Sequence, residues 1–261
     1  MAKGVAMLEA VIFDFDGVLV DSEKLHYQAF NRVLTKFNYQ LSIRDYYDRF
    51  LGLSDQELLR IVDKEGKLSL SNQQFEKLLG EKANLFKEMA ATEAGPVRKN
   101  RNTKISDKSQ VPNGAGIIEG VPGFLNMLAG NKIPIGICSG ALLPEIETIL
   151  KSAGLRNYFD VVVSAEQVER GKPDPEGFLL ALKLLNKLVR HSCGGKLHKS
   201  IKPENCVVIE DSHWGLEAAK AAGMRTVAIT NTYAAEHLKP ADKVIEHLNE
   251  LSIAELHAIC S

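Results

Sequence analysis

Short runs of apolar residues recur along the chain, and longer segments with helical periodicity separate the later runs. The strand-like runs are Val11–Phe13, Ile133–Ile137, Val161–Val163, Val207–Ile209 and Val227–Ile229. The helical patterns between them are Pro144–Ala153, Pro175–Leu188 and Gly215–Ala222. Strands that alternate with helices are typical of βαβ units, which form a parallel sheet buried on both faces. The pattern therefore predicts an α/β fold with helices on both sides of one parallel sheet.

The segment 21–117 breaks this alternation, because it holds helical patterns and no convincing strand. These patterns are Glu23–Phe37, Asp55–Lys64 and Asn72–Ala90. Ser54 and Ser71 precede the second and third of them and are expected to be N-caps. We expect a discontinuous core, 1–20 and 118–261, with 21–117 as an inserted all-helical domain. Because it follows the first strand, this domain is expected above the carboxyl edge of the sheet, as a lid.

Two segments are expected to be irregular. Gly95–Gly116 is rich in Gly, Pro, Asn and Ser and has a net charge of +4, from Arg98, Lys99, Arg101, Lys104 and Lys108 against Asp107. It is interpreted as a solvated linker, or alternatively as a basic flap that attracts phosphate. The second is Val189–Glu204, where His191, Cys193 and His198 lack the spacing of a zinc site.

Composition excludes several classes of protein. The net charge of −1 gives no field that would steer the chain to nucleic acid or to an anionic membrane. No apolar run is long enough to span a bilayer, and Met1–Ala10 lacks the layout of a secretory signal. The four cysteines are scattered without paired spacing. We therefore expect reduced thiols in the cytoplasm or a similarly reducing compartment.

Two carboxylates end the first apolar run. Asp14 and Asp16 are spaced i, i+2, and Gly17 follows at once. The end of a parallel strand lies at the carboxyl edge, where open α/β sheets bind their ligands. Two acids crowded there repel each other unless they share a cation or a proton. The pair on its own is weak evidence, and its position at the end of a buried strand makes it a candidate site.

Each later strand leads into a residue suited to phosphate chemistry. Ser139 and Gly140 offer a hydroxyl and backbone N–H groups where a helix is expected to open, although Ser139 could be a plain N-cap. Lys172 lies in a proline-fixed turn, although most lysines are solvated surface groups. Glu210 and Asp211 are adjacent acids, which alone would be more typical of a helix-capping turn.

Together these residues would meet at one edge of one sheet. Carboxylate oxygens with room left for water and phosphate suit Mg²⁺. An aspartate nucleophile could form an acyl phosphate, while a second acid protonates the leaving alkoxide and then deprotonates water. An ammonium group and a hydroxyl with N–H donors could hold the phosphoryl group in transfer.

Four motifs resemble those of the haloacid dehalogenase-like phosphohydrolases, in the β-phosphoglucomutase-like or CbbY-like branch with a helical cap. In chain order, the matching residues are Asp14–Ser22, Ser139-Gly140, Lys172-Pro173-Asp174-Pro175, and Glu210-Asp211-Ser212 with Gly215. Their order and separations fit over nearly the whole chain apart from the two irregular segments. The resemblance implies a Rossmann-like core, a helical cap and a Mg²⁺-dependent reaction of a small phosphorylated metabolite.

The resemblance also implies catalytic and metal-binding roles. Asp14 would be the nucleophile and a metal ligand. Asp16 would be the acid/base and would lend its backbone carbonyl to Mg²⁺. Asp211, with Glu210 at or near the metal, would complete the protein ligands. Members that act as dehalogenases lack an acid at the position of Asp16, so carbon–halogen chemistry is disfavoured.

The substrate-binding residues follow from the same resemblance. Ser139, Gly140, Lys172 and Gly17 would bind the phosphoryl group. His26 matches a cap-hinge histidine that may support the acid/base, although packing of its helix explains it equally well. In the cap, the expected substrate-binding residues are Gly52 and Ser54.

Hydrolysis is favoured over phosphate transfer within a sugar. A mutase needs a second phosphate site in its cap, and in the resembling branch basic residues flank that loop. Here Leu51 and Asp55 stand at those positions, and an anionic Asp55 would repel a second phosphate. Arg60, Lys64 or the basic segment could still supply a replacement cation.

The expected function is therefore a phosphatase for a small phosphomonoester, such as a sugar phosphate. The alternatives are a sugar-phosphate mutase and a catalytically idle Mg²⁺-binding protein of the same fold. The substrate and the oligomeric state are not readable from the sequence, with a monomer slightly favoured.

Overall fold

The computed structural model describes residues 7–50, 53–65, 68–93, 116–192 and 200–261. The chain forms two compact units. The first comprises Met1–Val20, Ile118–Leu143 and Asn157–Ser261, and the second comprises Asp21–Ile117 and Pro144–Arg156. The expected division by function, into a catalytic core and a cap, stays a prediction.

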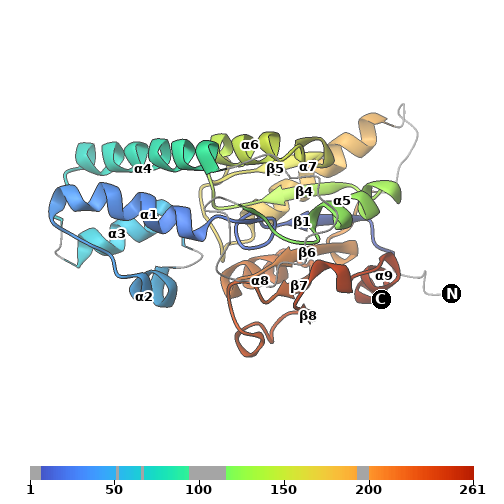
Figure 1. Ribbon diagram of the computed structural model, residues 1–261. Helices are drawn as coiled ribbons and strands as arrows, with labels where there is room; N and C mark the ends of the chain where they lie inside the picture. The colour runs from blue at the N-terminus through green and yellow to red at the C-terminus, as the bar shows by residue number, and fades with distance from the viewer. Residues whose placement is uncertain (1–6, 51–52, 66–67, 94–115, 193–199) are drawn as a thin grey trace, which may run out of the picture. The chain divides into compact units, whose positions relative to one another are not determined.

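The first unit is built on a six-stranded sheet (Figure 1). Its spatial order is β5 (Val161–Val163), β4 (Ile135–Cys138), β1 (Ala10–Phe13), β6 (Cys206–Glu210), β7 (Arg225–Ile229) and β8 (Lys243–Ile245). Each neighbouring pair is parallel. The predicted parallel α/β architecture is confirmed, and the central position of β1 explains why its four residues are all buried.

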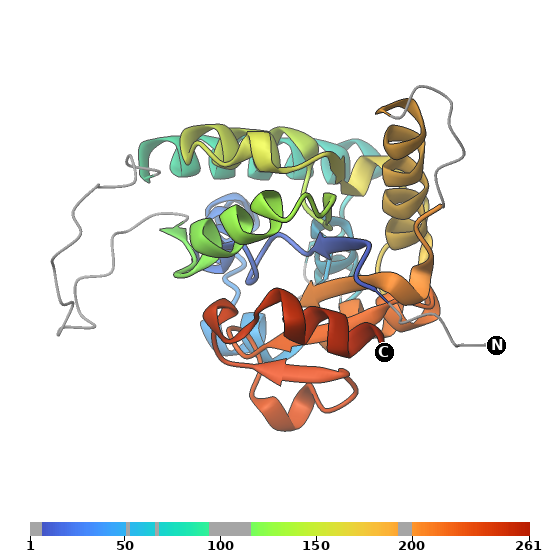
Figure 2. The same ribbon diagram turned by 90° about the vertical axis from the view of Figure 1, so that its right-hand side faces the viewer.

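Helices cover both faces of this sheet (Figure 2). On one face, Ile12 lies in a hydrophobic cluster with Phe178 of α7 (Glu176–Ser192) and Ala218 of α8 (His213–Ala221). On the other face, the ring of Phe13 meets that of Phe124 edge-on, with 5.9 Å between centroids. Phe124 belongs to α5 (Val121–Gly130), and α9 (Ile253–Cys260) packs against β6. Successive side chains of β1 thus anchor opposite layers, which holds its carboxyl end rigidly.

The second unit is mainly helical, as expected for 21–117, and it also contains Pro144–Arg156, which was expected in the core. Its helices are α1 (Glu23–Leu34), α2 (Ile43–Asp45), α3 (Asp55–Lys64), α4 (Asn72–Glu93) and α6 (Leu143–Ser152), with a 3-10 turn at Thr35–Phe37 and a π-helical turn at Tyr46–Phe50. Ser54 forms a capping box with Glu57, and the Ser71 hydroxyl accepts from the Gln74 amide at 3.3 Å. Both predicted N-caps are confirmed. The short strands β2 (Val20–Asp21) and β3 (Gly116–Ile117) form a separate two-stranded sheet.

Some expectations about the segments need correction. Helix α7 continues to Ser192, so Val189–Ser192 is helical where a loop was expected. The sequence pattern also failed to indicate α5, β8 and α9. Most of the basic segment and residues 193–199, with Cys193 and His198, lie outside the described residues.

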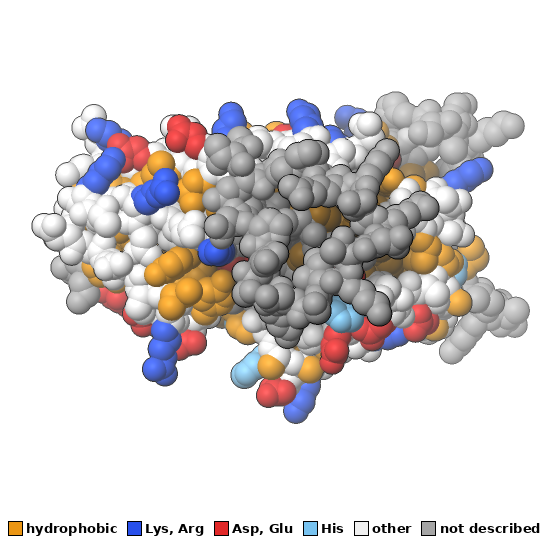
Figure 3. All heavy atoms as spheres, viewed as in Figure 1, with side chains coloured by type: hydrophobic (Ala, Val, Ile, Leu, Met, Phe, Trp, Pro, Cys, Tyr) orange, Lys and Arg blue, Asp and Glu red, His pale blue; other side chains and the backbone are white. Residues whose placement is uncertain are grey.

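The distribution of charged side chains and the hydropathy of the helices both bear on the partners of the protein. On the face drawn in Figure 3, acidic and basic side chains are interspersed among the residues shown in colour. Within the part of the chain that the structure describes, no helix is long and apolar enough to cross a membrane.

Candidate functional site

The loop after β1 places Asp14 and Asp16 at the carboxyl edge of the sheet. The Asp14 amide donates to the Ile209 carbonyl at 2.9 Å, so the strand pairing continues to the first acid. The Phe15 carbonyl then accepts from the amides of Leu19 and Val20, at 2.9 and 3.1 Å. This tight turn leaves Asp14 buried and Asp16 half-buried.

Gly17 is required in this loop for two reasons. Its φ is +75°, a left-handed conformation that favours glycine. A Cβ atom on this residue would also lie 1.8 Å from Oδ2 of Asp211. The backbone of the first loop therefore packs directly against the carboxylate of Asp211, the residue after β6. The prediction that Gly17 contacts a phosphoryl group stays a prediction.

The carboxylate of Glu210 organises the end of β6. Its Oε2 accepts hydrogen bonds from the amides of Asp211 and Ser212 and from the Ser212 hydroxyl, each at 2.9 Å. Its Oε1 accepts from Nζ of Lys172 at 2.6 Å. Gly215 is needed beside it, because a Cβ there would lie 1.6 Å from Oε1 of Glu210. Glu210 is thus fully engaged in holding the turn and the lysine.

Lys172 reaches the acids from the turn before α7. The Asp174 amide closes this turn on the Gly171 carbonyl at 2.9 Å, and the Lys172–Pro173 peptide bond is cis. Nζ of Lys172 donates to Oδ1 of Asp14 and to Oε1 of Glu210, both at 2.6 Å. The ammonium therefore bridges the ends of β1 and β6, so Lys172 is not a solvated surface lysine.

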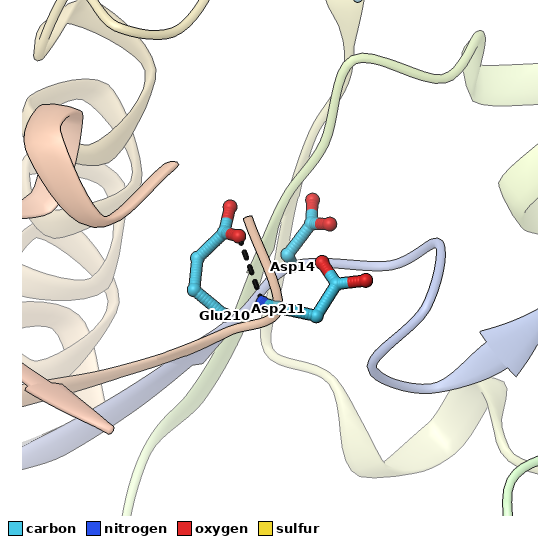
Figure 4. Close-up of side chains that lie close together, drawn as sticks. All are labelled: Asp14, Glu210 and Asp211. Carbon is cyan, nitrogen blue, oxygen red and sulfur yellow. Dashed lines mark hydrogen bonds between the residues drawn. The ribbon is translucent and has the colours of Figure 1, made fainter. Parts of the chain in front are cut away.

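Asp14, Glu210 and Asp211 form a buried acidic cluster (Figure 4). One carboxylate oxygen from each residue lies within 4.8 Å of the others, which is close enough for a shared cation. Burial raises the pKa of Asp14 to about 7; Lys172 opposes this rise, whereas Glu210 and Asp16 add to it.

Lys172 remains charged beside this cluster. Burial alone would lower the pKa of Lys172, but Asp14 and Glu210 outweigh burial and raise it. One ammonium faces three carboxylates, so the site retains an excess of negative charge. Hard oxygen donors with such an excess fit a divalent cation.

Asn231 is a site residue that the sequence pattern did not single out. Its Nδ2 donates to the carbonyl of Gly17 at 2.8 Å, from the loop after β7. The side chain of Thr232 lies close to Gly17 as well. A polar residue two positions beyond the strand-like run Val227–Ile229 was the available signal, because that strand ends at the same edge.

Ser139 and Gly140 follow β4 at the same edge, but they do not open a helix. Helix α6 begins at Leu143, and the carboxylate of Glu166 accepts from the Leu143 amide at 2.8 Å. The hydroxyl of Ser139 instead accepts from the Ala141 amide at 2.9 Å, which forms a local turn. The expectation of a helix start at Ser139 was therefore wrong, while its role in binding phosphate is untested.

The cap residues singled out from the sequence lie in the second unit. His26 is buried in α1, and its ring stacks on that of Phe86 with centroids 4.2 Å apart. Ser54 is the N-cap of α3, as described above, and Gly52 lies outside the described residues. Their roles in binding substrate stay predictions.

Comparisons with known proteins find relatives that match most of the chain. A family model described as haloacid dehalogenase-like hydrolase matches residues 11–229. A phosphorylated carbohydrates phosphatase of Thermotoga maritima is 31% identical over 221 residues, which cover 84% of each chain. β-Phosphoglucomutase of Bacillus subtilis is 26% identical over 96% of this chain and 94% of its own.

A solved structure extends the likeness to the fold. β-Phosphoglucomutase from Clostridium difficile is 26% identical, covers 97% of both chains and superposes with a TM-score of 0.74. The acidic cluster and Lys172 lie within the matched residues 11–229, as do β4, β5, β6, β7 and all of β1 except Ala10. The chain belongs to the haloacid dehalogenase-like hydrolase family.

Proposed function

We propose that this protein is a Mg²⁺-dependent phosphatase that hydrolyses a small phosphomonoester, a sugar phosphate, through an aspartyl phosphate on Asp14. The observation that carries the proposal is the bridge from Lys172 to Asp14 and Glu210 within a buried acidic cluster. A phosphatase for phosphorylated carbohydrates among the relatives supports the same reaction.

Asp14, Asp211 and the backbone carbonyl of Asp16 would hold the Mg²⁺ ion. Glu210 already accepts four hydrogen bonds, so its part is to position Lys172 and the Asp211 turn beside the ion. When bound, the cation would neutralise the excess negative charge of the cluster and of the substrate phosphate.

The reaction would then proceed in two steps, transfer of the phosphoryl group to Asp14 and hydrolysis of the aspartyl phosphate. A carboxylate oxygen of Asp14 forms a bond to phosphorus as the bond from phosphorus to the leaving oxygen breaks, and Asp16 gives its proton to that oxygen. Water next attacks the phosphorus and gives a proton to Asp16, and the bond between Asp14 and phosphorus breaks. Lys172, the Ser139 hydroxyl and the Gly140 amide would hold the phosphoryl oxygens.

The helical unit is proposed to be the cap that selects the leaving group, with His26, Gly52 and Ser54 among its substrate-binding residues. We also place the protein in a reducing compartment such as the cytoplasm. The free, buried thiols of Cys138, Cys206 and Cys260 support that placement.

The direct test is release of inorganic phosphate from p-nitrophenyl phosphate and from a panel of sugar phosphates. With Mg²⁺ we expect turnover that chelation abolishes, and the Asp14→Asn variant should lose at least 10³-fold in kcat. A folded protein that releases no phosphate from any ester would instead support the idle, Mg²⁺-binding alternative.

A mutase is the second candidate, because β-phosphoglucomutases are among the relatives and neighbours. The protein should be incubated with β-glucose 1-phosphate and a bisphosphate primer. We expect free phosphate to appear faster than glucose 6-phosphate. If glucose 6-phosphate appears faster than free phosphate, the protein is a mutase and the phosphatase proposal is wrong.

A further inference from the structure

Lys82 is a fully buried lysine in the helical unit. Its side chain on α4 has 0% exposure, and its Nζ lies 5.2 and 5.0 Å from the ring centroids of Phe30 and Phe86. A lysine on an amphipathic helix normally reaches solvent. Burial of an ammonium is unfavourable unless charged and polar partners surround it. Its partners therefore determine what this part of the unit can bind.

Three side chains surround this ammonium. Lys82 Nζ lies 2.7 Å from Oδ2 of Asp55, 2.6 Å from Nδ1 of His26 and 4.0 Å from Oε1 of Glu145. An ammonium can only donate, so Nδ1 of His26 accepts and the ring hydrogen lies on Nε2. The charge of Lys82 is thus neutralised by carboxylates of its own chain.

Asp55 holds the solvent side of this cluster. Its side chain is 26% exposed, whereas that of Glu145 is 4% exposed. Asp55 is the first residue of α3, and the capping box of Ser54 fixes that end of the helix. An anion that approached Lys82 from solvent would therefore have to displace the Asp55 carboxylate.

Other cations of the helical unit also have acidic partners. Lys36 pairs with Glu81 at 2.7 Å, and Arg49 pairs with Glu65. These exposed pairs are weak on their own. They differ from the Lys82 cluster, where the cation is dehydrated and its interaction with an anion is correspondingly stronger.

We propose that Asp55 is a specificity-determining residue, whose carboxylate fills the anion position beside Lys82 and so excludes a second phosphate from the helical unit. This inference rests on the proposed phosphatase function and narrows its substrates. They are phosphomonoesters that carry no second phosphate. A phosphate that reached the helical unit would meet the carboxylate of Asp55 in the place of a free cation.

The test is the preference for glucose 6-phosphate over glucose 1,6-bisphosphate. It is measured as kcat/KM for the monophosphate divided by kcat/KM for the bisphosphate. In the Asp55→Asn variant we expect this ratio to fall at least tenfold, through a lower KM for the bisphosphate. Asp48→Asn is the matched control, because it removes a carboxylate that pairs only at the exposed surface with Arg44. An equal fall in the control, or no fall in Asp55→Asn, would overturn the proposal.

Binding without turnover separates this inference from the proposed activity. In an Asp14→Asn background, calorimetry should show at least tenfold tighter binding of glucose 1,6-bisphosphate when Asp55→Asn is added. Adding Lys82→Met should remove that gain. If the gain persists without Lys82, the inference is wrong. A gain in binding together with no phosphatase activity in the parent protein would leave the inference standing and refute the phosphatase.

A charge-conserving variant covers the case in which Asp55→Asn fails to fold. Asp55→Glu keeps the negative charge and should keep the preference of the parent protein for the monophosphate. Acceptance of the bisphosphate by Asp55→Glu, within twofold of the monophosphate, would contradict a role for the carboxylate charge. Thermal unfolding of each variant verifies that the compared proteins are folded.

Discussion

The substitution Glu210→Gln tests whether Glu210 stabilises the site by holding Lys172. The side chain keeps its size, and the amide oxygen can still accept from the Asp211 and Ser212 donors. Its NH₂ group then faces the ammonium of Lys172, and two donors cannot pair. The loss comprises one charge-assisted hydrogen bond and one partner of a buried charge, worth about 3 kcal/mol of unfolding free energy.

Urea unfolding in the presence of a chelator is the appropriate assay, because it reports on the site without metal. Trp214, the one tryptophan of the chain, lies at the start of α8 and provides the fluorescence signal. Glu236→Gln is the control, since Glu236 is exposed in the turn after β7 and its loss should change stability by less than about 0.5 kcal/mol. Displacement of Lys172 should also lower kcat/KM about 10²-fold.

The competing explanation makes the opposite prediction. If Glu210 acts chiefly as a metal ligand, its charge repels Asp14 and Asp211 in the metal-free protein. Neutralising it would then leave the metal-free stability unchanged or higher and would weaken only the binding of Mg²⁺. That result would refute the reasoning above.

Two further predictions follow from the same cluster. Gly17→Ala should abolish most activity and destabilise the protein by about 3 kcal/mol, because the new Cβ would lie 1.8 Å from Oδ2 of Asp211 and φ is +75°. Gly80→Ala is the control, since there is open space around its new Cβ, and it should keep both phosphatase activity and stability to urea. Burial raises the pKa of Asp14 to about 7 in the metal-free protein, with Lys172 opposing this rise. The folded state therefore holds this proton more tightly than the unfolded state, and the contribution of Asp14 to stability falls as pH rises from about 4 to about 7. Mg²⁺ must displace the proton, so its apparent affinity should rise up to tenfold per pH unit below about 7 and then level off; calorimetric affinities that stay constant from pH 5.5 to 7 would contradict this.

The sequence predicted the elements whose pattern is local and strong. The run Val161–Val163 and the helix Asp55–Lys64 have the same bounds in the structure as in the sequence pattern. Helix α5 was missed because Gly120, Pro122 and Gly123 at its start are typical of a turn. Strand β8 was missed because it is a short edge strand of three residues.

The sequence predicted those parts of the candidate site that follow from where the strands end. Asp14, Lys172 and Asp211 converge because parallel strands share one edge. The pairing of Lys82 with Asp55 and His26 was beyond the sequence, since the three residues lie on three different helices. Nothing in the pattern of α4 distinguishes this lysine from its solvated neighbours, and packing of the helices decides which is buried.

The hydrogen bond from Asn231 to Gly17 has a consequence for biosynthesis. These residues are 214 positions apart, so the loop after β1 is held by Asn231 only after a further 214 residues have been synthesised. Strand β1 also lacks its neighbour on one side until β6 has been synthesised, so one edge of this apolar strand is unpaired until then. Until β6 has been synthesised, the nascent chain therefore exposes an apolar strand edge, which favours aggregation and is the kind of surface that chaperones of emerging polypeptides bind.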